Sequence, residues 1–289
     1  MNYIAVVNTI NRRQNLVERC INGLLVQKIK PRKVFLIDQN DEELTLSKEI
    51  LSNPLFEVKK VDFKSVSAAR NSIAVPESAE WIFFCDDDGY PCENYSELLY
   101  EIIMRDPKLQ ILAGSIIRED TKDFYSLRHK KGGSLKNFSN TKNLMGSNFV
   151  IKTSTFDYLQ RFDENFGAGS YWGSSEETDF CWKAYFENVP MEFFKELKVF
   201  HVPPFNESIS EGFIKSFKYG IGKGALVYKW LIRKRKLVVI YELMEMLIAP
   251  VIISIIGIFR LKPQLIATNF AALTGRLFGF FKAIVVNRI

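Results

Sequence analysis

WIFFCDDDGYP, residues Trp81 to Pro91, joins an unbroken apolar run directly to three consecutive acids, Asp86, Asp87 and Asp88. An apolar run without polar alternation is typical of a strand that is covered on both faces of a parallel sheet. In open α/β sheets, ligands bind at the edge formed by the carboxyl ends of the strands. The stretch therefore predicts an α/β protein in which one strand delivers acidic side chains to a ligand site.

Strand-like and helix-like segments alternate before this stretch, which is the order of βαβ units. In chain order, the predicted segments are the strand Tyr3 to Val7, the helix Leu16 to Leu25, the strand Val34 to Ile37, the helix Glu42 to Leu51, the strand Phe56 to Val61, the helix Ser67 to Ala74 and the strand Trp81 to Cys85. Four strands joined by crossovers form a Rossmann-like, nucleotide-binding half.

The order of elements becomes mixed after Pro91. The predicted segments are a helix Tyr95 to Met104, strands Ile111 to Ile117 and Asn148 to Lys152, a helix Glu176 to Phe186 and a short strand Lys198 to His201. The polar stretch from Arg118 to Asn143 has no clear period, and we expect a mobile loop there. The fold class is therefore α/β, with a single mixed, mostly parallel sheet.

Length and composition predict one large domain and an appended tail. A chain of 289 residues with 47% apolar residues can bury one large core, and a main domain of about 200 residues leaves about 80 for the tail. The expected division is a catalytic domain over 1–225 and a basic, apolar helical segment over 226–289. Four scattered cysteines without a C-x-x-C pair suit a reducing cytosol, and the amino terminus lacks the pattern of a signal peptide.

The tail combines basic and apolar stretches, a pattern that predicts contact with a membrane. KWLIRKRK, Lys229 to Lys236, accounts for much of the net charge of +6 and precedes two apolar stretches. Because Met246 to Phe259 has only 14 uncharged residues, we expect a peripheral or re-entrant helical hairpin at the cytoplasmic side of the cell membrane. The second interpretation is one or two spanning helices, and the third is a buried helical subdomain.

KYGIGKG, Lys218 to Gly224, is either a basic lid or a helix break.

The three acids have both a chemical and a structural interpretation. A divalent cation with hard oxygen ligands would relieve the repulsion between them and would also bind a diphosphate. The alternative is an acidic turn that caps the next helix. Arg12 and Arg70 also have two interpretations. Each guanidinium has paired donors that match the oxygens of a diphosphate, or each arginine forms a surface salt bridge. Asp38 can accept from a base or ribose, or simply shape a turn.

Several motifs, taken together, resemble glycosyltransferase family 2, whose members have the GT-A fold. Asp86-x-Asp88 at the end of an apolar strand is similar to the family's D-x-D motif. The other similar segments are Thr9-x-Asn11-Arg12, Asp38, Ser67 to Asn71 (SAARN), Gly146 to Phe156, Arg161 to Gly167, Ser175 to Phe180 (SEETDF) and His201. The resemblance covers roughly residues 3 to 225, and its motifs are specific only as a set.

The resemblance implies an inverting, metal-dependent glycosyltransferase. The implied donor is a nucleotide diphosphate sugar of UDP or dTDP type, and the acceptor is a saccharide or lipid-linked saccharide in the synthesis of a cell-surface polysaccharide or glycan. It implies a Mn²⁺ or Mg²⁺ cofactor held by Asp86, Asp88 and His201, although a lone histidine at a strand end is more often structural. The implied donor-binding residues are Thr9, Asn11, Arg12, Asp38, Ser67, Arg70, Asn71, Asp86 and Asp87.

The catalytic base must be another carboxylate, because metal ligands cannot take up a proton. The resemblance places it at Glu177, with Glu176 and Asp179 as the other candidates. All three also suit the first turn of a helix, where the helix dipole favours acids. The expected acceptor-binding residues are Asn148, Tyr171 and Trp172, although the two aromatic side chains can equally anchor their loop in the core.

Two other functions compete with sugar transfer. A sugar nucleotidyltransferase would need a glycine-rich loop after the first strand, and Asn8 to Gln14 contains no glycine. A membrane-docked, inactive nucleotide-binding scaffold is the non-enzymatic alternative. Nucleic acid is not an expected partner, because the basic excess is confined to the tail and no recognisable module interleaves aromatic and basic residues.

Overall fold

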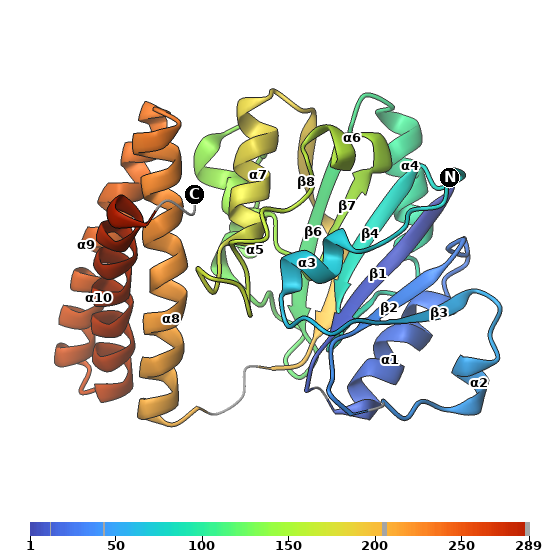
Figure 1. Ribbon diagram of the computed structural model, residues 1–289, viewed down its shortest axis with the longest axis horizontal. Coiled ribbons are helices and arrows are strands. Elements are labelled where there is room, and N and C mark those ends of the chain that lie inside the picture. The colour runs from blue at the N-terminus through green and yellow to red at the C-terminus, as the bar shows by residue number, and fades with distance from the viewer. Residues whose placement is uncertain (12, 43, 204–206, 287–289) are drawn as a thin grey trace. The chain divides into compact units, whose positions relative to one another are not determined.

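The computed structural model describes residues 1–11, 13–42, 44–203 and 207–286 (Figure 1). The chain forms two compact units. We call Met1–Phe162 with Phe180–Pro203 the sheet unit, and Asp163–Asp179 with Pro204–Ile289 the helical unit. The predicted division at 225/226 falls inside one continuous helix, Ile209–Tyr228, so it does not coincide with a boundary between elements.

The sheet unit contains an eight-stranded sheet in the order β3-β2-β1-β4-β7-β6-β8-β5. The strands are β1 Tyr3–Thr9, β2 Val34–Asp38, β3 Phe56–Lys60, β4 Trp81–Asp86, β5 Gly89–Pro91, β6 Ile111–Arg118, β7 Phe149–Lys152 and β8 Met191–His201. Strands β3, β2, β1 and β4 are parallel, as the βαβ pattern predicts. Strand β7 is antiparallel to both β4 and β6, which makes the sheet mixed.

Helices cover both faces of this sheet (Figure 1). They are α1 Gln14–Leu25, α2 Lys48–Leu51, α3 Val66–Asn71, α4 Tyr95–Arg105, α5 Leu127–Lys131, α6 Thr153–Tyr158 and α7 Glu176–Phe186, with a 3₁₀ helix η1 Phe138–Asn143. Alternate side chains of β1 enter opposite cores: Ala5 packs with α1 and α4, and Val6 packs with α3 and α6. Burial on both faces explains the unbroken apolar runs of the central strands.

Two predicted elements differ most from the structure in where they begin. The helix predicted from Glu42 begins only at Lys48, because the preceding residues lack apolar side chains at helical spacing. Strand β8 begins at Met191 instead of Lys198. Its pairing with β6 shifts register between Gly114 and Ser115. Because of this irregularity the strand lacks one regular sequence pattern along its length, and only its last residues were predicted.

The polar stretch from Arg118 to Asn143 is ordered, contrary to prediction, because a buried histidine holds it. His129 is 0% exposed and accepts a hydrogen bond at Nδ1 from the Ile116 amide, at 3.0 Å. Its Nε2 lies 3.0 Å from the Asn143 carbonyl oxygen, to which it donates. Burial lowers the pKa of His129 to about 4, so the ring is neutral and one imidazole ties α5 to both β6 and the end of η1.

We expect acid to destabilise the protein through His129. The unfolded chain takes up a proton at His129 near pH 6.5, and the folded protein does so only near pH 4. The stabilisation contributed by the neutral ring is therefore fully present above pH 6.5 and is lost as the pH falls towards 4. The loss reaches about 3 kcal/mol. Urea unfolding of wild type and His129→Gln at pH 7.5, 5.5 and 4.5 measures it. The variant should be less stable at pH 7.5 and less sensitive to acid; equal slopes would contradict the assignment.

The helical unit is built on three long helices, coloured orange to red in Figure 1. They are α8 Ile209–Tyr228, α9 Ile240–Phe259 and α10 Pro263–Val285. A π-helical turn (η2, Lys229–Arg233) and a 3₁₀ turn (η3, Leu237–Val239) join α8 to α9. Helix α10 packs against both α8 and α9.

Paired glycines bring α8 and α10 into close contact. Gly220 and Gly224 of α8 face Gly275 and Gly279 of α10, and a Cβ atom on Gly220 would lie 2.7 Å from the Ala272 carbonyl oxygen. Two small residues four positions apart on each helix are the packing motif by which backbones approach closely. KYGIGKG is therefore part of a continuous helix, and both the lid and the helix-break interpretations are wrong.

Candidate active site

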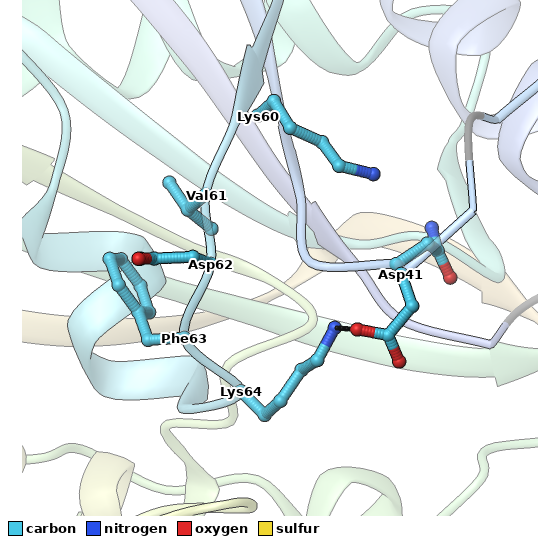
Figure 2. A pocket seen from close by; sticks show the side chains of 7 residues that line it. Asp41, Lys60, Val61, Asp62, Phe63 and Lys64 are labelled. Carbon is cyan, nitrogen blue, oxygen red and sulfur yellow. Dashed lines mark ion pairs between the residues drawn. The ribbon is translucent and has the colours of Figure 1, made fainter.

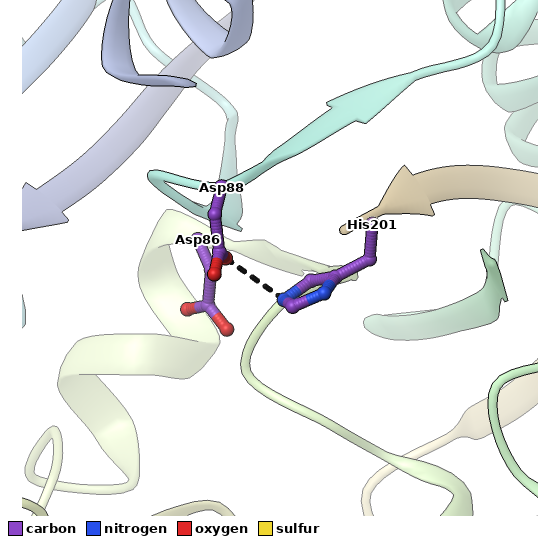
Figure 3. A group of neighbouring side chains, drawn as sticks. All are labelled: Asp86, Asp88 and His201. Carbon is purple, nitrogen blue, oxygen red and sulfur yellow. Dashed lines mark ion pairs between the residues drawn. The ribbon is translucent and has the colours of Figure 1, made fainter. Parts of the chain in front are cut away.

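Two acids and a histidine meet at the carboxyl end of β4. Asp86 ends β4, Asp88 follows two residues later, and His201 ends β8, where it pairs with Gly89 of β5. One ligand atom from each of the three side chains lies within 4.8 Å of the others (Figure 3). Two carboxylates and an imidazole are ligands that Mn²⁺ or Mg²⁺ accepts. The residues present therefore fit a divalent cation.

The orientation of His201 suits a metal ligand. Its Nδ1 donates to the Val202 carbonyl oxygen at 2.9 Å, so Nε2 faces Asp88 Oδ1 at 2.8 Å. A backbone acceptor on one ring nitrogen sets the tautomer that leaves the other nitrogen for a metal. Burial acts to lower the pKa of His201, but the adjacent Asp88 outweighs it and the pKa is raised. The same negative charge of Asp88 that raises this pKa would also attract a cation.

Asp86 has two further partners in the sheet unit. Arg70 from α3 is 2% exposed, and its Nη2 lies 3.2 Å from Asp86 Oδ1. The Ser147 hydroxyl donates to Asp86 Oδ2. The guanidinium also lies over the Phe162 ring, at 5.4 Å from its centroid. Arg70 is thus a fixed cation beside the acidic cluster, and the surface salt-bridge interpretation is wrong because this arginine is buried. Ser147 carries no signal in the sequence, since a serine before a strand is commonplace.

The middle acid of the cluster is held differently. Thr9, at the end of β1, donates from Oγ1 to Asp87 Oδ2 at 2.6 Å, and both side chains are buried. Parallel pairing of β1 with β4 brings the ends of these two strands together. Asp87 therefore joins neighbouring strand ends, while Asp86 and Asp88 form the cation-type group.

A pocket of about 500 Å³ opens beyond the carboxyl ends of β2 and β3 (Figure 2). It is lined by Asn40, Asp41, Lys60, Val61, Asp62, Phe63 and Lys64. Lys64 Nζ lies 2.7 Å from Asp41 Oδ1 across it. The stretch from Lys60 to Lys64 was not predicted as part of a site, because no motif marks the end of β3.

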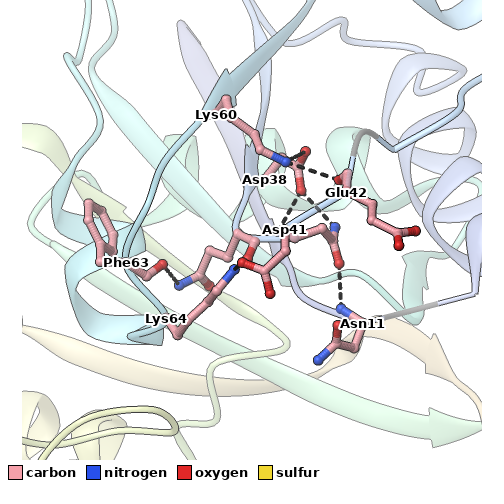
Figure 4. A network of polar contacts seen from close by, with 9 residues as sticks. Asn11, Asp38, Asp41, Glu42, Lys60, Phe63 and Lys64 are labelled. Carbon is pink, nitrogen blue, oxygen red and sulfur yellow. Dashed lines mark hydrogen bonds and ion pairs between the residues drawn. The ribbon is translucent and has the colours of Figure 1, made fainter.

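Asp38 lies behind this pocket in a polar network (Figure 4). It is 3% exposed, accepts from the Asn40 amide at 2.9 Å and pairs with Lys60 Nζ at 3.0 Å. The Asn11 amide donates to the side chain of Asn40 at 2.6 Å, which connects β1 to the same network. Arg12 lies outside the described residues. The network makes Asp38 a support of the loop at Asn40, in addition to any contact with a nucleotide.

The other predicted donor-binding residues are supports of α3. Ser67 is 0% exposed. Asn71 donates from Nδ2 to the Phe162 carbonyl oxygen at 2.9 Å and accepts from the Phe162 amide at 3.0 Å. Both residues thus lie in the packing that holds Arg70 next to Asp86.

Asn148 occupies a core position. It is 0% exposed, accepts from the Tyr95 hydroxyl at 2.6 Å and donates to the Ser115 and Leu197 carbonyl oxygens, each at 2.9 Å. These bonds link β7 to β6 and β8, so the amide has no exposed group to offer the acceptor for which it was predicted.

The helical unit carries the predicted base and the predicted aromatic acceptor contacts. Asp179 is 0% exposed and bound by Lys229 and Trp230, whereas Glu176 is 8% exposed and Glu177 is half-buried. Of the three acids, Glu177 is therefore the most accessible to an acceptor hydroxyl.

Trp172 and Tyr171 differ in their exposure. Trp172 is 1% exposed and packs against Phe166, which fits the anchoring interpretation. Tyr171 is 38% exposed, and the ammonium of Lys282 lies 4.2 Å from the centroid of its ring. Only Tyr171 therefore presents a ring that a sugar can reach.

Comparisons with known proteins show which family and which fold this chain resembles. The family model for glycosyl transferase family 2 matches residues 4–200. A crystal structure of S. aureus TarS residues 1–349 is similar in fold, with a TM-score of 0.57 and 15% identity, over 80% of this chain and 66% of that one. The same TarS fragment in complex with UDP-GlcNAc matches equally well, over 67% of its chain. No curated protein is detectably similar in sequence.

The family match covers more than half of the chain and spans the sheet that delivers Asp86, Asp88 and His201 to one edge. The TarS structures share the mixed, GT-A-like sheet, which confirms the fold class predicted from the strand pattern. The chain therefore belongs to glycosyl transferase family 2 and is a glycosyltransferase.

Proposed function

We propose that this enzyme transfers a sugar from a nucleotide diphosphate sugar, of UDP or dTDP type, to a saccharide or lipid-linked saccharide acceptor in the synthesis of a cell-surface polysaccharide or glycan. The observation that carries the proposal is the convergence of Asp86, Asp88 and His201 within 4.8 Å at the ligand edge of the sheet. Mn²⁺ or Mg²⁺ held there would neutralise the charge that develops on the departing nucleoside diphosphate.

The surrounding side chains support binding of the same donor. Buried Arg70 adds a fixed guanidinium next to Asp86, and guanidinium donors match phosphate oxygens. The pocket beyond β2 and β3 is large enough for a nucleoside, since sites for small ligands begin at about 300 Å³. That TarS crystallised with UDP-GlcNAc in a similar fold supports a uridine donor.

Glu177 is the proposed base. In a single displacement its carboxylate removes the proton of the acceptor hydroxyl as that oxygen attacks the anomeric carbon, so the anomeric configuration inverts. Glu177 lies in the first turn of α7, beside the other two candidate acids. A carboxylate that binds no metal is required for this step, and Glu177 is the least buried of the three candidates in this turn.

Release of nucleoside diphosphate tests the proposal directly. The full-length protein is incubated with UDP- and dTDP-sugars, with Mn²⁺ or with EDTA, and slow hydrolysis of the donor is measured. We expect Mn²⁺-dependent release from one donor, and an increase in melting temperature with the matching nucleoside diphosphate and Mn²⁺. A protein that neither hydrolyses nor binds any of these donors would refute nucleotide-sugar transfer.

We also propose that the helical unit binds the cytoplasmic face of the membrane. Among the residues that the structure describes, one helix, Leu237–Phe259, is long and apolar enough to span a bilayer; its mean hydropathy is 2.1, and 22% of its most apolar 18-residue window is buried. Its outward side chains include Ile248, Ile252, Ile255 and Phe259, all exposed. Helix α9 has 20 residues, more than the 14 uncharged residues on which the prediction of a peripheral or re-entrant hairpin was based. About 20 residues are needed to cross the hydrocarbon, so this length supports a spanning helix.

The basic run should control this binding on anionic lipid. We expect the triple variant Arg233→Gln, Lys234→Gln and Arg235→Gln to bind vesicles with phosphatidylserine about 10²-fold more weakly, at about 1 kcal/mol per charge. Vesicle co-sedimentation measures the loss. Removing three charges from α5 instead, at Arg128, Lys130 and Lys131, is the matched control and should change little. Equal losses from both variants would show a nonspecific charge effect and contradict a membrane-facing tail.

A further inference from the structure

A buried lysine joins two acids within the helical unit. Lys229 Nζ lies 2.8 Å from Asp163 Oδ2 and 2.8 Å from Asp179 Oδ1. The side chains of Lys229 and Asp179 are 7% and 1% exposed, and that of Asp163 is 19% exposed. The ammonium also lies 4.8 Å from the centroid of the Phe166 ring. Little water reaches this ion triad, so its geometry depends on all three charges.

The π-helical turn explains why Lys229 points inward. This turn, Lys229–Arg233, begins where α8 ends, and both Lys229 and its neighbour Trp230 are 5% exposed. Trp230 Nε1 donates to the same Asp179 Oδ1 at 2.7 Å. Arg233 on the same turn and Lys234 directly after it are exposed. π-helical turns are rare and are frequent at functional sites, and here the turn directs two consecutive side chains to one carboxylate.

The two acids bracket the segment that carries the proposed base. Asp163 and Asp179 are the first and last residues of Asp163–Asp179, the part of the helical unit that precedes the long helices in sequence. Asp163 accepts from the Asn165 amide at 3.0 Å, and the Asp179 amide donates to the Ser175 carbonyl oxygen at 2.9 Å. Glu177 lies two residues before Asp179 in the same first turn of α7. One ammonium thus ties the start of the segment to the turn that carries Glu177.

The middle of the segment rests on α8. Ser174 donates from Oγ to the Tyr219 carbonyl oxygen at 2.9 Å. A Cβ atom on Gly222 would lie 2.8 Å from the Trp172 carbonyl oxygen, so the absence of a side chain lets the segment approach the helix. The two ends of the segment, Asp163 and Asp179, are both paired with Lys229.

The charges of the triad reinforce one another. Burial acts to lower the pKa of Lys229, but Asp179 and Asp163 outweigh it and the pKa is raised. Burial acts to raise the pKa of Asp163, and Lys229 reverses this, so that pKa is lowered. The lysine is therefore charged at neutral pH. Without it, two acids would face each other in a nearly dry site and repel.

We propose that Lys229 is a positioning residue, which fixes Asp163–Asp179 and thereby holds Glu177 in its working place. This inference rests on the proposed role of Glu177 as the base. In this proposal Lys229, the first residue of the basic run, supports the reaction, whereas Arg233 to Lys236 are the residues proposed to bind the membrane. Lys229 touches neither donor nor acceptor in this role and acts only through the first turn of α7.

Lys229→Met tests the proposal, because methionine keeps most of the length of the side chain and removes the charge. We expect kcat to fall at least 30-fold, with the KM for the nucleotide sugar and the Kd for nucleoside diphosphate with Mn²⁺ unchanged within twofold. The triple variant Lys229→Met, Asp163→Asn and Asp179→Asn removes all three charges and should recover most of kcat. A loss of donor affinity as large as that of kcat, or no recovery in the triple variant, would overturn the positioning role.

Hydrogen exchange tests the same role without any substrate. The amides of residues 163–179 should exchange at least tenfold faster in Lys229→Met, and those of the central strands β1 and β4 should not change. Lys215→Met, which removes the ion pair between Lys215 of α8 and Glu207 just before that helix, is the matched control and should leave both regions unchanged. Unchanged exchange over 163–179 in Lys229→Met would overturn the proposal.

The two proposals can fail separately. If wild type transfers no sugar, the proposed function fails, and hydrogen exchange still decides whether Lys229 orders the segment. If Lys229→Met does not fold, Asp163→Asn takes its place, because it keeps the pair between Lys229 and Asp179. Exchange over 163–179 should then rise at least threefold, and no change would overturn the proposal.

Discussion

Asp88→Asn will lower sugar transfer about 10³-fold and remove Mn²⁺-dependent binding of the nucleoside diphosphate. The reason is the loss of one anionic ligand from a three-residue group, together with the pairing of Asp88 with His201 at 2.8 Å. A metal that stabilises a leaving diphosphate supplies several kcal/mol to the transition state, and about 4 kcal/mol corresponds to 10³-fold. Initial rates of transfer and calorimetric titration with and without Mn²⁺ measure the two effects.

Glu101→Gln is the control for Asp88→Asn. Glu101 is an exposed acid of α4 in the same unit, so the substitution also removes one negative charge but leaves the strand edge intact. It should transfer sugar at the wild-type rate. If Asp88→Asn instead keeps half of the activity and still binds nucleoside diphosphate only with Mn²⁺, the metal site lies elsewhere.

Glu177→Gln should lower kcat by 10²- to 10⁴-fold, the usual contribution of a general base. Glutamine keeps the shape of the side chain and cannot accept the proton of the acceptor hydroxyl. The proposed donor-binding and metal-binding residues lie on the sheet unit, so the Kd for nucleoside diphosphate with Mn²⁺ should stay within twofold of wild type. Single-turnover transfer and equilibrium binding with the same preparation separate the two quantities.

Glu176→Gln decides which acid of the pair is the base. Glu176 is 8% exposed and precedes Glu177 in the same turn, so the two variants remove the same charge next to the same helix start. The proposal expects Glu176→Gln to retain at least a tenth of the activity. If it is the inactive variant and Glu177→Gln is active, the base is Glu176.

Asp179 cannot be tested in the same way. Its carboxylate is bound by Lys229 and by Trp230. Asp179→Asn would therefore change the ion triad and remove a candidate base at the same time, so a loss of activity alone would not identify the base. A loss of activity in that variant should be accompanied by faster exchange over 163–179, which distinguishes a positional effect from the loss of a base.

The central strands and the acidic cluster were evident from the sequence for local reasons. A strand buried on both faces needs an apolar residue at every position, so Trp81 to Cys85 and Tyr3 to Val7 could be recognised without any knowledge of their partners. The acids that follow Cys85 then lie at a strand end, which is where α/β sheets bind ligands. His201 was placed by resemblance, and the pairing of β8 with β5 confirms that it ends its strand there.

Other features depended on contacts between segments that are distant in the chain. The polar stretch from Arg118 to Asn143 looked mobile because it has no period, yet buried His129 holds it by bonds to Ile116 and Asn143. The glycines of α8 suggested a break because glycine is a poor helix former, but packing against α10 outweighs that local preference.

The sequence by itself determined the central strands, where the acids lie along the chain and which family the motifs resemble. Only the tertiary structure decided which side chains meet: Ser147 and Arg70 at Asp86, Lys60 at Asp38, and Lys229 between Asp163 and Asp179. Hydrophobic period and backbone propensity act over a few neighbouring residues. The meeting of charged groups depends on strand order and helix packing, which bring together residues far apart in the chain.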